Sequence, residues 1–266
     1  MRSIFFVIST SFFLFSCDSG PNLADICQQD NEICAVFTPD SWCKSERKNT
    51  IFALSSLKET PSEQLKYHLL LSYENYAKCV AFSTKIEHIK LKEKRTARIK
   101  NHLKAKKLIE KLSNETKNST NPDLLFYHWS RYLDENALNA FLAMEGSAML
   151  ETPNAQFHLA THYSKRDTGK TLTLLFHALE LQKPEHAINP EIFQTLSTIF
   201  MDKNKPKQAY IWLKVLQLYQ PENKKINNKT LIDFSKGFQL DSTFLDKVAL
   251  STLTKINTGT FEAPSF

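Results

Sequence analysis

Residues 189–219 read NPEIFQTLSTIFMDKNKPKQAYIWLKVLQLY, and residues 152–181 read TPNAQFHLATHYSKRDTGKTLTLLFHALEL. The two stretches align at an offset of 37 residues, and apolar or aromatic side chains coincide along them. The matched pairs are Leu159 and Leu196, Tyr163 and Phe200, Leu175 and Trp212, Ala178 and Val215, Leu179 and Leu216, and Leu181 and Leu218. Each stretch predicts a first helix, a short charged turn and a longer second helix. A repeat of this length is typical of stacked helix–turn–helix units.

Each repeat begins at a capping residue followed by proline. Such pairs, spaced 31 and 37 residues apart, are Asn121-Pro122, Thr152-Pro153 and Asn189-Pro190. An Asn or Thr side chain accepts hydrogen bonds from the first N–H groups of a helix, and proline is favoured in the first turn. The sequence therefore predicts a tetratricopeptide-like solenoid over residues 122–220, whose first copy is the weakest. An irregular helical bundle is the alternative.

The rest of the chain also predicts helices. Only 5 of 266 residues are glycine, and alternating β-branched runs are nearly absent, so the composition indicates an all-α protein. Scarce glycine also disfavours a phosphate-binding loop. We expect a helical hairpin and a basic helix over 42–113, a polar linker over 113–121, and two further helices over 221–266. The last residues, from Thr258, are expected to form a loose tail.

Five cysteines, at positions 17, 27, 34, 43 and 79, constrain the first part of the chain. Residues 42–57 predict one helix, and the capping-box sequence from Thr60 to Glu63 begins the next, so the chain turns near residue 60. Cys43 lies 17 residues before residue 60 and Cys79 lies 19 after it, which brings them to the same height in an antiparallel hairpin. We predict disulfides Cys43–Cys79 and Cys27–Cys34. The spacings match no zinc site.

The amino terminus resembles a bacterial lipoprotein signal peptide over residues 1–16. Arg2 precedes a short apolar run, and Leu14, Ser16 and Cys17 match the lipobox at three of its positions, whereas Phe15 replaces the usual small residue. The resemblance implies lipidation of Cys17, which anchors a Cys-containing tether over 17–41. A secreted protein in which Cys17 forms a disulfide is the alternative. The expected location is a membrane facing the periplasm. Asp18 favours the inner membrane, with the outer membrane as the alternative.

Positive charge is concentrated in one segment. Residues 85–111 hold eleven Lys and Arg against three Glu, which predicts an amphipathic helix with a basic face. That face comprises Lys92, Lys94, Arg95, Arg98, Lys104, Lys106 and Lys107. The face is either simply solvated or docks onto anionic lipid headgroups or cell-wall polymer. Nucleic acid is not expected as a partner of an exported protein.

The sequence offers no catalytic constellation. His158 and His162 are spaced like two zinc ligands, but Leu159 stands where a zincin carries its Glu, so no metal is expected. Glu145 and Glu151 could act as general acids on cell-wall glycan, yet neither has a second group beside it in the sequence. We predict no cofactor, no small-molecule substrate and no enzyme activity.

Aromatic residues are dense in the repeats, and most are expected in the core. Three with polar tips, Tyr127, Tyr132 and Tyr210, are candidates to line a concave face that binds a partner.

Several segments together resemble one family. They are CDSGPNLADIC (17–27), DSWC (40–43), LLLSYENYAKCV (69–80), PDLLFYHWSRYLDENAL (122–138) and AYIWLKVLQLY (209–219). The chain resembles gammaproteobacterial lipoproteins catalogued as domain of unknown function 2989, over almost its whole mature length. The resemblance implies a lipoprotein with helical repeats and carries no activity. We expect a non-enzymatic adaptor for an envelope protein. The alternatives are a module that binds wall polymer or anionic lipid, and a peptidoglycan-acting enzyme.

Overall fold

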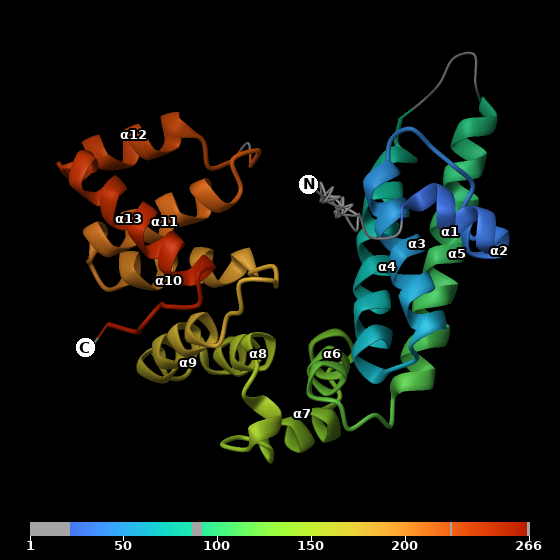
Figure 1. Cartoon of the computed structure of the whole chain (residues 1–266), viewed down its shortest axis with the longest axis horizontal. Coiled ribbons are helices and arrows are strands. Elements are labelled where there is room, and N and C mark those ends of the chain that lie inside the picture. Colours follow the sequence, from blue (N-terminus) through green and yellow to red (C-terminus); the bar gives the residue numbers. More distant parts are fainter. Residues whose placement is uncertain (1–21, 87–91, 224, 265–266) are drawn as a thin grey trace, which may run out of the picture. The chain divides into compact units, whose positions relative to one another are not determined.

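The computed structural model describes residues 22–86, 92–223 and 225–264, and every regular element in those ranges is a helix (Figure 1). The expected all-α class is confirmed. The chain divides into two compact units, Met1–Glu115 and Thr116–Phe266, which we call unit 1 and unit 2 and describe separately. Within the described ranges, none of the helices combines the length and the hydropathy that a membrane span requires.

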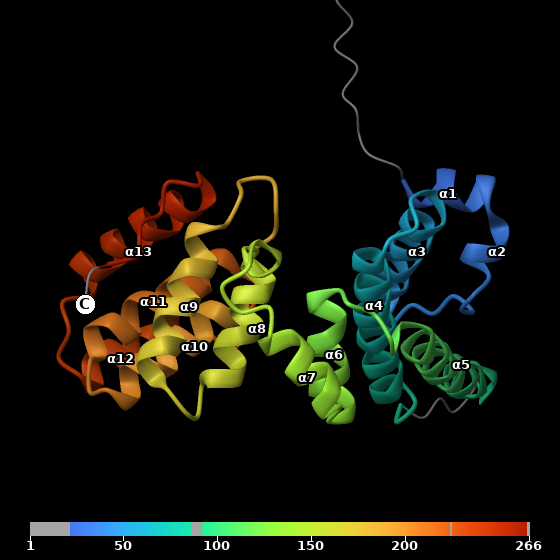
Figure 2. The same ribbon diagram turned by 90° about the horizontal axis from the view of Figure 1, so that it is seen from below.

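Unit 1 is built on a helical hairpin with two short helices packed on its first member (Figures 1 and 2). Its helices are α1 (Leu23–Gln29), α2 (Asn31–Cys34), α3 (Lys44–Glu59), α4 (Glu63–Ser83) and α5 (Lys92–Thr116). The hairpin is α3 and α4, as predicted. The cap of α4 is Ser62, whose hydroxyl accepts a hydrogen bond from the Leu65 N–H at 3.2 Å. The N-cap of α4 therefore lies two residues later than the Thr60 expected from the sequence.

Polar side chains tie the segment before α3 to α5. Asn101 accepts a hydrogen bond from the Thr38 N–H at 3.1 Å and donates one to the Thr38 carbonyl at 2.9 Å. Arg98 is 3% exposed, and its guanidinium donates to Asp40 at 2.9 Å and to the Ser83 carbonyl at 3.0 Å. A buried guanidinium needs such acceptors, and here they lie inside the unit. Placing Arg98 on the exposed basic face was therefore wrong.

Unit 2 contains three consecutive helical hairpins followed by two more helices (Figure 2). Its helices are α6 (Pro122–Tyr132), α7 (Glu135–Leu142), the short 3-10 helix η1 (Ala148–Leu150), α8 (Pro153–Tyr163), α9 (Thr168–Glu180), α10 (Pro190–Asp202), α11 (Pro206–Tyr219), α12 (Asn228–Gly237) and α13 (Ser242–Asn257). The hairpins pair α6 with α7, α8 with α9, and α10 with α11. Neighbouring hairpins contact each other through α6 and α8 and through α9 and α10, so the predicted stacking is confirmed.

The predicted capping residues begin the first helix of each hairpin. Asn121 accepts from the Asp123 N–H at 3.0 Å, Thr152 from the Ala155 N–H at 3.2 Å, and Asn189 from the Glu191 N–H at 3.0 Å. Proline follows each cap in the first turn of its helix. These bonds satisfy N–H groups that have no partner within a helix, which explains why each helix begins there.

The residues matched between the repeats lie in the core of unit 2. Four of the six matched pairs are buried in full: Leu159 and Leu196, Leu175 and Trp212, Ala178 and Val215, and Leu179 and Leu216. Their periodicity on two helices per repeat produces the apolar faces that stack.

The polar linker between the two units is shorter than predicted. Ser113 and Thr116 are buried in the last turn of α5, so the polar linker begins later than residue 113.

After α11 the hairpin pattern changes, because α13 packs mainly on α11 rather than on α12. Tyr210, Leu231 and Leu245 form the apolar cluster that joins α11, α12 and α13.

Candidate functional site

Unit 2 carries a cleft of about 750 Å³ beside α11 and α13, which we call the α11–α13 cleft. Phe176 of α9 and Phe200 of α10 extend its apolar wall. The other residues from the helices and their caps are Lys205, Gln208, Ile211, Trp212, Lys247, Val248, Ser251, Thr252 and Lys255. The remaining wall is formed by the segment that follows α13.

That segment, residues 258–264, is here called the tail segment (Figure 1), and its Phe261 packs against the apolar core of unit 2. The Phe261 ring lies 6.4 Å from Phe176, nearly parallel to it, and 6.3 Å from Trp212 in an edge contact. The Ala263 N–H donates to Glu180 at 2.8 Å. The expectation of a loose tail was therefore wrong for these residues, because Phe261 finds an aromatic surface that spacing in the sequence does not reveal.

Charge in the α11–α13 cleft is mainly positive. Lys205, Lys247 and Lys255 line it, and the acidic residue among the lining residues is Glu262 of the tail segment. All four residues are exposed. We did not predict this site from the sequence. The sequence feature that could have indicated the site is Phe261, an aromatic residue in a polar stretch shortly after a glycine.

The three tyrosines predicted to bind a partner have different surroundings. Tyr127 and Tyr210 are each 2% exposed, whereas Tyr132 is 52% exposed. The Tyr210 hydroxyl donates to Asp246 at 2.8 Å, and burial, followed by this hydrogen bond, raises its pKa. Tyr127 and Tyr210 are core residues, so their assignment to a binding face was wrong. Of the three, Tyr132 alone presents its ring to solvent.

Glu145 and Glu151 are paired with basic side chains. Glu145 accepts hydrogen bonds from Lys170 at 2.6 Å and from Tyr163 at 2.8 Å. Burial raises the pKa of Glu145, but these two hydrogen bonds outweigh it and hold the pKa below its ordinary value. A general acid must keep its proton near neutral pH, so this environment favours the opposite state. Glu151 lies 2.7 Å from His177 Nε2.

His158 and His162 have structural partners. The His158 ring stacks on Phe126 at 3.9 Å, and its Nε2 lies 3.0 Å from Asp123. His162 lies 5.6 Å from Trp129, and Arg166 hydrogen-bonds to its ring nitrogen at 2.8 Å. The two imidazoles therefore contribute to contacts between α6 and α8 and between α8 and the turn that follows it.

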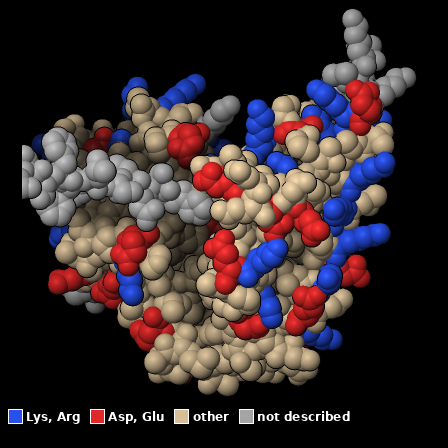
Figure 3. Space-filling view, turned by 45° about the vertical axis from the view of Figure 1, so that its right-hand side comes forward, with Lys and Arg blue, Asp and Glu red and all other residues tan. Residues whose placement is uncertain are grey.

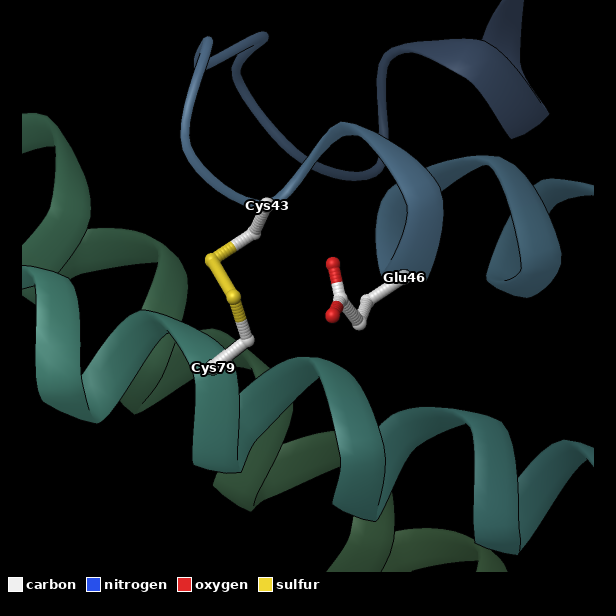
Figure 4. A group of neighbouring side chains, drawn as sticks. All are labelled: Cys43, Glu46 and Cys79. Carbon is white, nitrogen blue, oxygen red and sulfur yellow. A yellow bond between two sulfur atoms is a disulfide. The ribbon is translucent and has the colours of Figure 1, made fainter. Parts of the chain in front are cut away.

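Both predicted disulfides are present in unit 1. Cys27–Cys34 joins α1 to α2, with Cα atoms 5.5 Å apart, and Cys43–Cys79 joins the start of α3 to α4, with Cα atoms 6.0 Å apart. Glu46 lies beside the second disulfide, and its carboxylate is within 4.8 Å of both sulfur atoms (Figure 4). Because each sulfur is bonded to the other, neither is a thiolate that could bind a metal ion.

The basic face of α5 is exposed on unit 1 where the structure describes its side chains. Its exposed members are Lys94, Arg95, Lys104, Lys106 and Lys107. Lys92 begins α5, but its side chain lies outside the described residues. In Figure 3, Lys and Arg gather along the right-hand edge. Ile99 and Leu103 are 42% and 55% exposed on the same helix, so apolar and basic side chains share this surface.

Cys17 and residues 1–16, predicted as a signal peptide, lie outside the described residues, as does the start of the predicted tether over 17–41. The described part of that tether begins at Asn22, which caps α1 by accepting from the Asp25 N–H at 3.0 Å.

Unit 1 is thus cross-linked by two disulfides, and unit 2 is a stack of helical hairpins in which the tail segment borders the α11–α13 cleft. The chain matches the family described as "Protein of unknown function (DUF2989)" over residues 14–214, and it belongs to that family. Comparison with curated proteins and with solved structures gives no match.

Proposed function

We propose that this protein is a lipid-anchored, non-enzymatic adaptor that binds another envelope protein at the periplasmic face of a membrane. The α11–α13 cleft carries the proposal, because it already holds an extended polypeptide segment against aromatic side chains. Solenoids of helical hairpins bind extended peptides in grooves of this kind, an analogy at the level of fold. The lowered pKa of Glu145 favours this function over an enzyme that uses Glu145 as an acid.

The anchor in this proposal is Cys17. The support is the sequence before it, with one basic residue, a short apolar run and a lipobox-like ending. Asp18 favours the inner membrane, and the bacterial origin follows the resemblance described above. Labelling cells with radioactive palmitate tests the anchor. Label should appear in the wild type and disappear in Cys17→Ser, and persistence of label in that variant would refute the anchor.

Crosslinking in living cells tests the adaptor. A photoreactive residue placed at Gln208, which lines the α11–α13 cleft, should capture one dominant envelope protein. The matched control is the same residue at Thr173, which is exposed on α9 and does not line the cleft. Absence of a protein adduct from Gln208, or the same adducts from both positions, contradicts the proposal.

A second candidate function is binding of unit 1 to an anionic lipid surface. Exposed Ile99 and Leu103 among lysines carry this candidate, because a basic surface with apolar side chains suits the lipid interface. The segment that joins the described residues to Cys17 also keeps unit 1 near any membrane that holds the lipid.

Binding to lipid vesicles tests this candidate. The Cys17→Ser chain is used, so that the measured binding comes from α5 and not from a lipid on Cys17. Phosphatidylglycerol vesicles should bind the chain, and phosphatidylcholine vesicles should not. Each lysine near the surface contributes about 1 kcal/mol, so replacing Lys104, Lys106 and Lys107 by Glu should weaken binding at least about 100-fold. The control replaces three exposed lysines of unit 2 by Glu and changes the net charge by the same amount. These lysines are Lys203, Lys207 and Lys229. Equal weakening in both variants contradicts a specific role for α5.

A further inference from the structure

The tail segment is directed back onto its own unit by the end of α13. Gly259 has a φ of +66°, a conformation that other residues adopt only with strain. Its N–H donates to the Ile256 carbonyl at 3.1 Å, and the Thr260 N–H donates to the Lys255 carbonyl at 2.9 Å. The chain therefore reverses at Gly259, and this turn brings Phe261 to the α11–α13 cleft.

The tail segment is held by few of its side chains. Phe261 is half-buried against Phe176 and Trp212, whereas Glu262, Ala263 and Pro264 are exposed. A cleft of about 750 Å³ remains beside the segment, so it borders the space without filling it. A segment held by one ring and by the hydrogen bond from the Ala263 N–H to Glu180 can leave without unfolding the helices beneath it.

The chemistry of the cleft matches the chemistry of the segment. Its aromatic surface receives the Phe261 ring, and Glu262, the next residue, carries a negative charge into a cleft lined by Lys205, Lys247 and Lys255. These lysines add three positive charges, and within the described residues that line the cleft Glu262 alone is acidic. An incoming segment with the same order of groups meets an aromatic surface and complementary charge.

We propose that the α11–α13 cleft binds an extended peptide of a partner protein, in which an aromatic residue precedes an acidic one, and that the tail segment occupies this site in the absence of the partner. The inference rests on the adaptor function proposed above and names the class of peptide that the adaptor recognises. Binding requires Phe261 to withdraw, so the tail segment competes with the partner.

Fluorescence anisotropy with a labelled peptide TGTFEAP, the sequence of residues 258–264, tests the inference on the full chain. The wild type should bind it weakly, because its own Phe261 occupies the site. Phe261→Ala empties the site and should bind the peptide at least tenfold more tightly. Phe244→Ala is the matched control, because Phe244 lies on α13, is 63% exposed and does not line the cleft, and it should bind like the wild type.

Three further measurements define the ligand class. A peptide with Ala in place of Phe should lose at least tenfold in affinity for the Phe261→Ala chain, and one with Lys in place of Glu should lose severalfold. Lys247→Glu added to Phe261→Ala should also weaken binding of the original peptide, with circular dichroism confirming that both variants are folded.

Equal binding by the wild type and Phe261→Ala, or equal affinity for a scrambled peptide, overturns the inference. If peptide exchange fails while Gln208 still crosslinks to one envelope protein, the inference is wrong and the adaptor function stands. If exchange succeeds but cells give no protein adduct, the adaptor function is contradicted instead.

Discussion

Unit 1 and unit 2 are both built from helical hairpins, but different interactions hold them together. Unit 2 contains a large continuous cluster of buried apolar residues from α8 to α13, and the sequence places no cysteine in it. In unit 1, the cluster that joins α1, α2 and α3 consists of Ile26, Cys34 and Ile51. Unit 1 also buries Phe37, Tyr73 and Tyr76 against one another, and two disulfides and the Arg98–Asp40 ion pair connect its elements in addition.

The difference shows how a repeat and a non-repeating unit reach stability. Each repeat of unit 2 buries one apolar face against the next, so its core grows with every hairpin. In unit 1, α1 and α2 are short and bury one side chain each, so cross-links that restrict the unfolded chain add to the stability that burial provides. Perturbations aimed at each kind of interaction should therefore affect one unit and leave the other unchanged.

Removal of the longer cross-link should have the largest effect. Cys43 and Cys79 are 36 residues apart, and the chain-entropy relation gives about 4 kcal/mol for such a loop. Cys43→Ser with Cys79→Ser should lower the free energy of unfolding of unit 1 by about that amount, as measured by hydrogen exchange with mass spectrometry. Cys27→Ser with Cys34→Ser opens a separation of 7 residues and should cost about 2 kcal/mol. Equal loss of protection in unit 2 would contradict the comparison.

A cavity in the repeat core should have the next largest effect. Leu196 is fully buried, and Leu→Ala substitutions at such sites cost about 3 kcal/mol. Leu196→Ala should lower the free energy of unfolding of unit 2 by this amount and leave exchange in unit 1 unchanged. Leu250→Ala, at a residue that is 57% exposed, is the control and should have little effect. A similar loss in both variants would show that packing at the repeat position is not the cause.

Removal of the buried guanidinium should have a smaller effect. Arg98→Met removes the cation that pairs with Asp40 and the guanidinium that donates to the Ser83 carbonyl, which keeps its hydrogen bond from the Ile86 N–H. We expect the free energy of unfolding of unit 1 to fall by about 2 kcal/mol, below the range for fully buried pairs because the Asp40 side chain keeps 14% of its surface exposed. Urea denaturation measures the change. Lys106→Met, on the exposed face of α5, should be neutral, and an equal loss there would rule out a specific role for the ion pair.

The smallest expected effect is a pH dependence confined to unit 2. Burial lowers the pKa of His128, although the hydrogen bond with Thr116 opposes this. The unfolded chain therefore binds more protons than the native chain near the ordinary histidine pKa, and this stability is present above about pH 6.5 and lost as pH falls through the folded pKa. His128→Gln should flatten that part of the curve of unfolding free energy against pH.

His177 should give a pH dependence of stability with the opposite sign, and it serves as the control. Burial lowers its pKa, but hydrogen bonds with Glu151 and Glu180 outweigh burial and raise it. Its contribution is present below about pH 6.5 and is lost as pH rises through the folded pKa. His177→Gln should remove stability mainly on the acidic side. If both substitutions changed the curve in the same direction, the surroundings described for one histidine would be incorrect.

The features predicted correctly from the sequence are those fixed by local spacing. Asn121, Thr152 and Asn189 cap helices because a cap depends only on the next three residues. The Cys43–Cys79 pairing followed from counting residues along two helices of known rise.

Apart from the cap of α4 and the end of α5, the errors concern which neighbours a side chain meets in space. Arg98 lies in a basic segment, but its burial depends on Asp40, 58 residues earlier in the chain. Tyr210 was expected at a binding face because its ring has a polar tip, and instead that tip is satisfied by Asp246 inside unit 2. Phe261 was assigned to a loose tail because nothing near it in the sequence indicates the rings of Phe176 and Trp212. Such contacts arise only once the hairpins have stacked.

The Cys43–Cys79 bond also determines how unit 1 responds to mechanical force. Tension applied to the chain on either side of the bond passes directly between the sulfur atoms and bypasses α3 and most of α4. The 36 residues of separation therefore cannot be drawn out, which withholds about 120 Å of extension at roughly 3.4 Å per residue. Single-molecule stretching should show this length only after reduction. In the adaptor proposed above, the residues between Cys43 and Cys79 would therefore add no length to the chain under load.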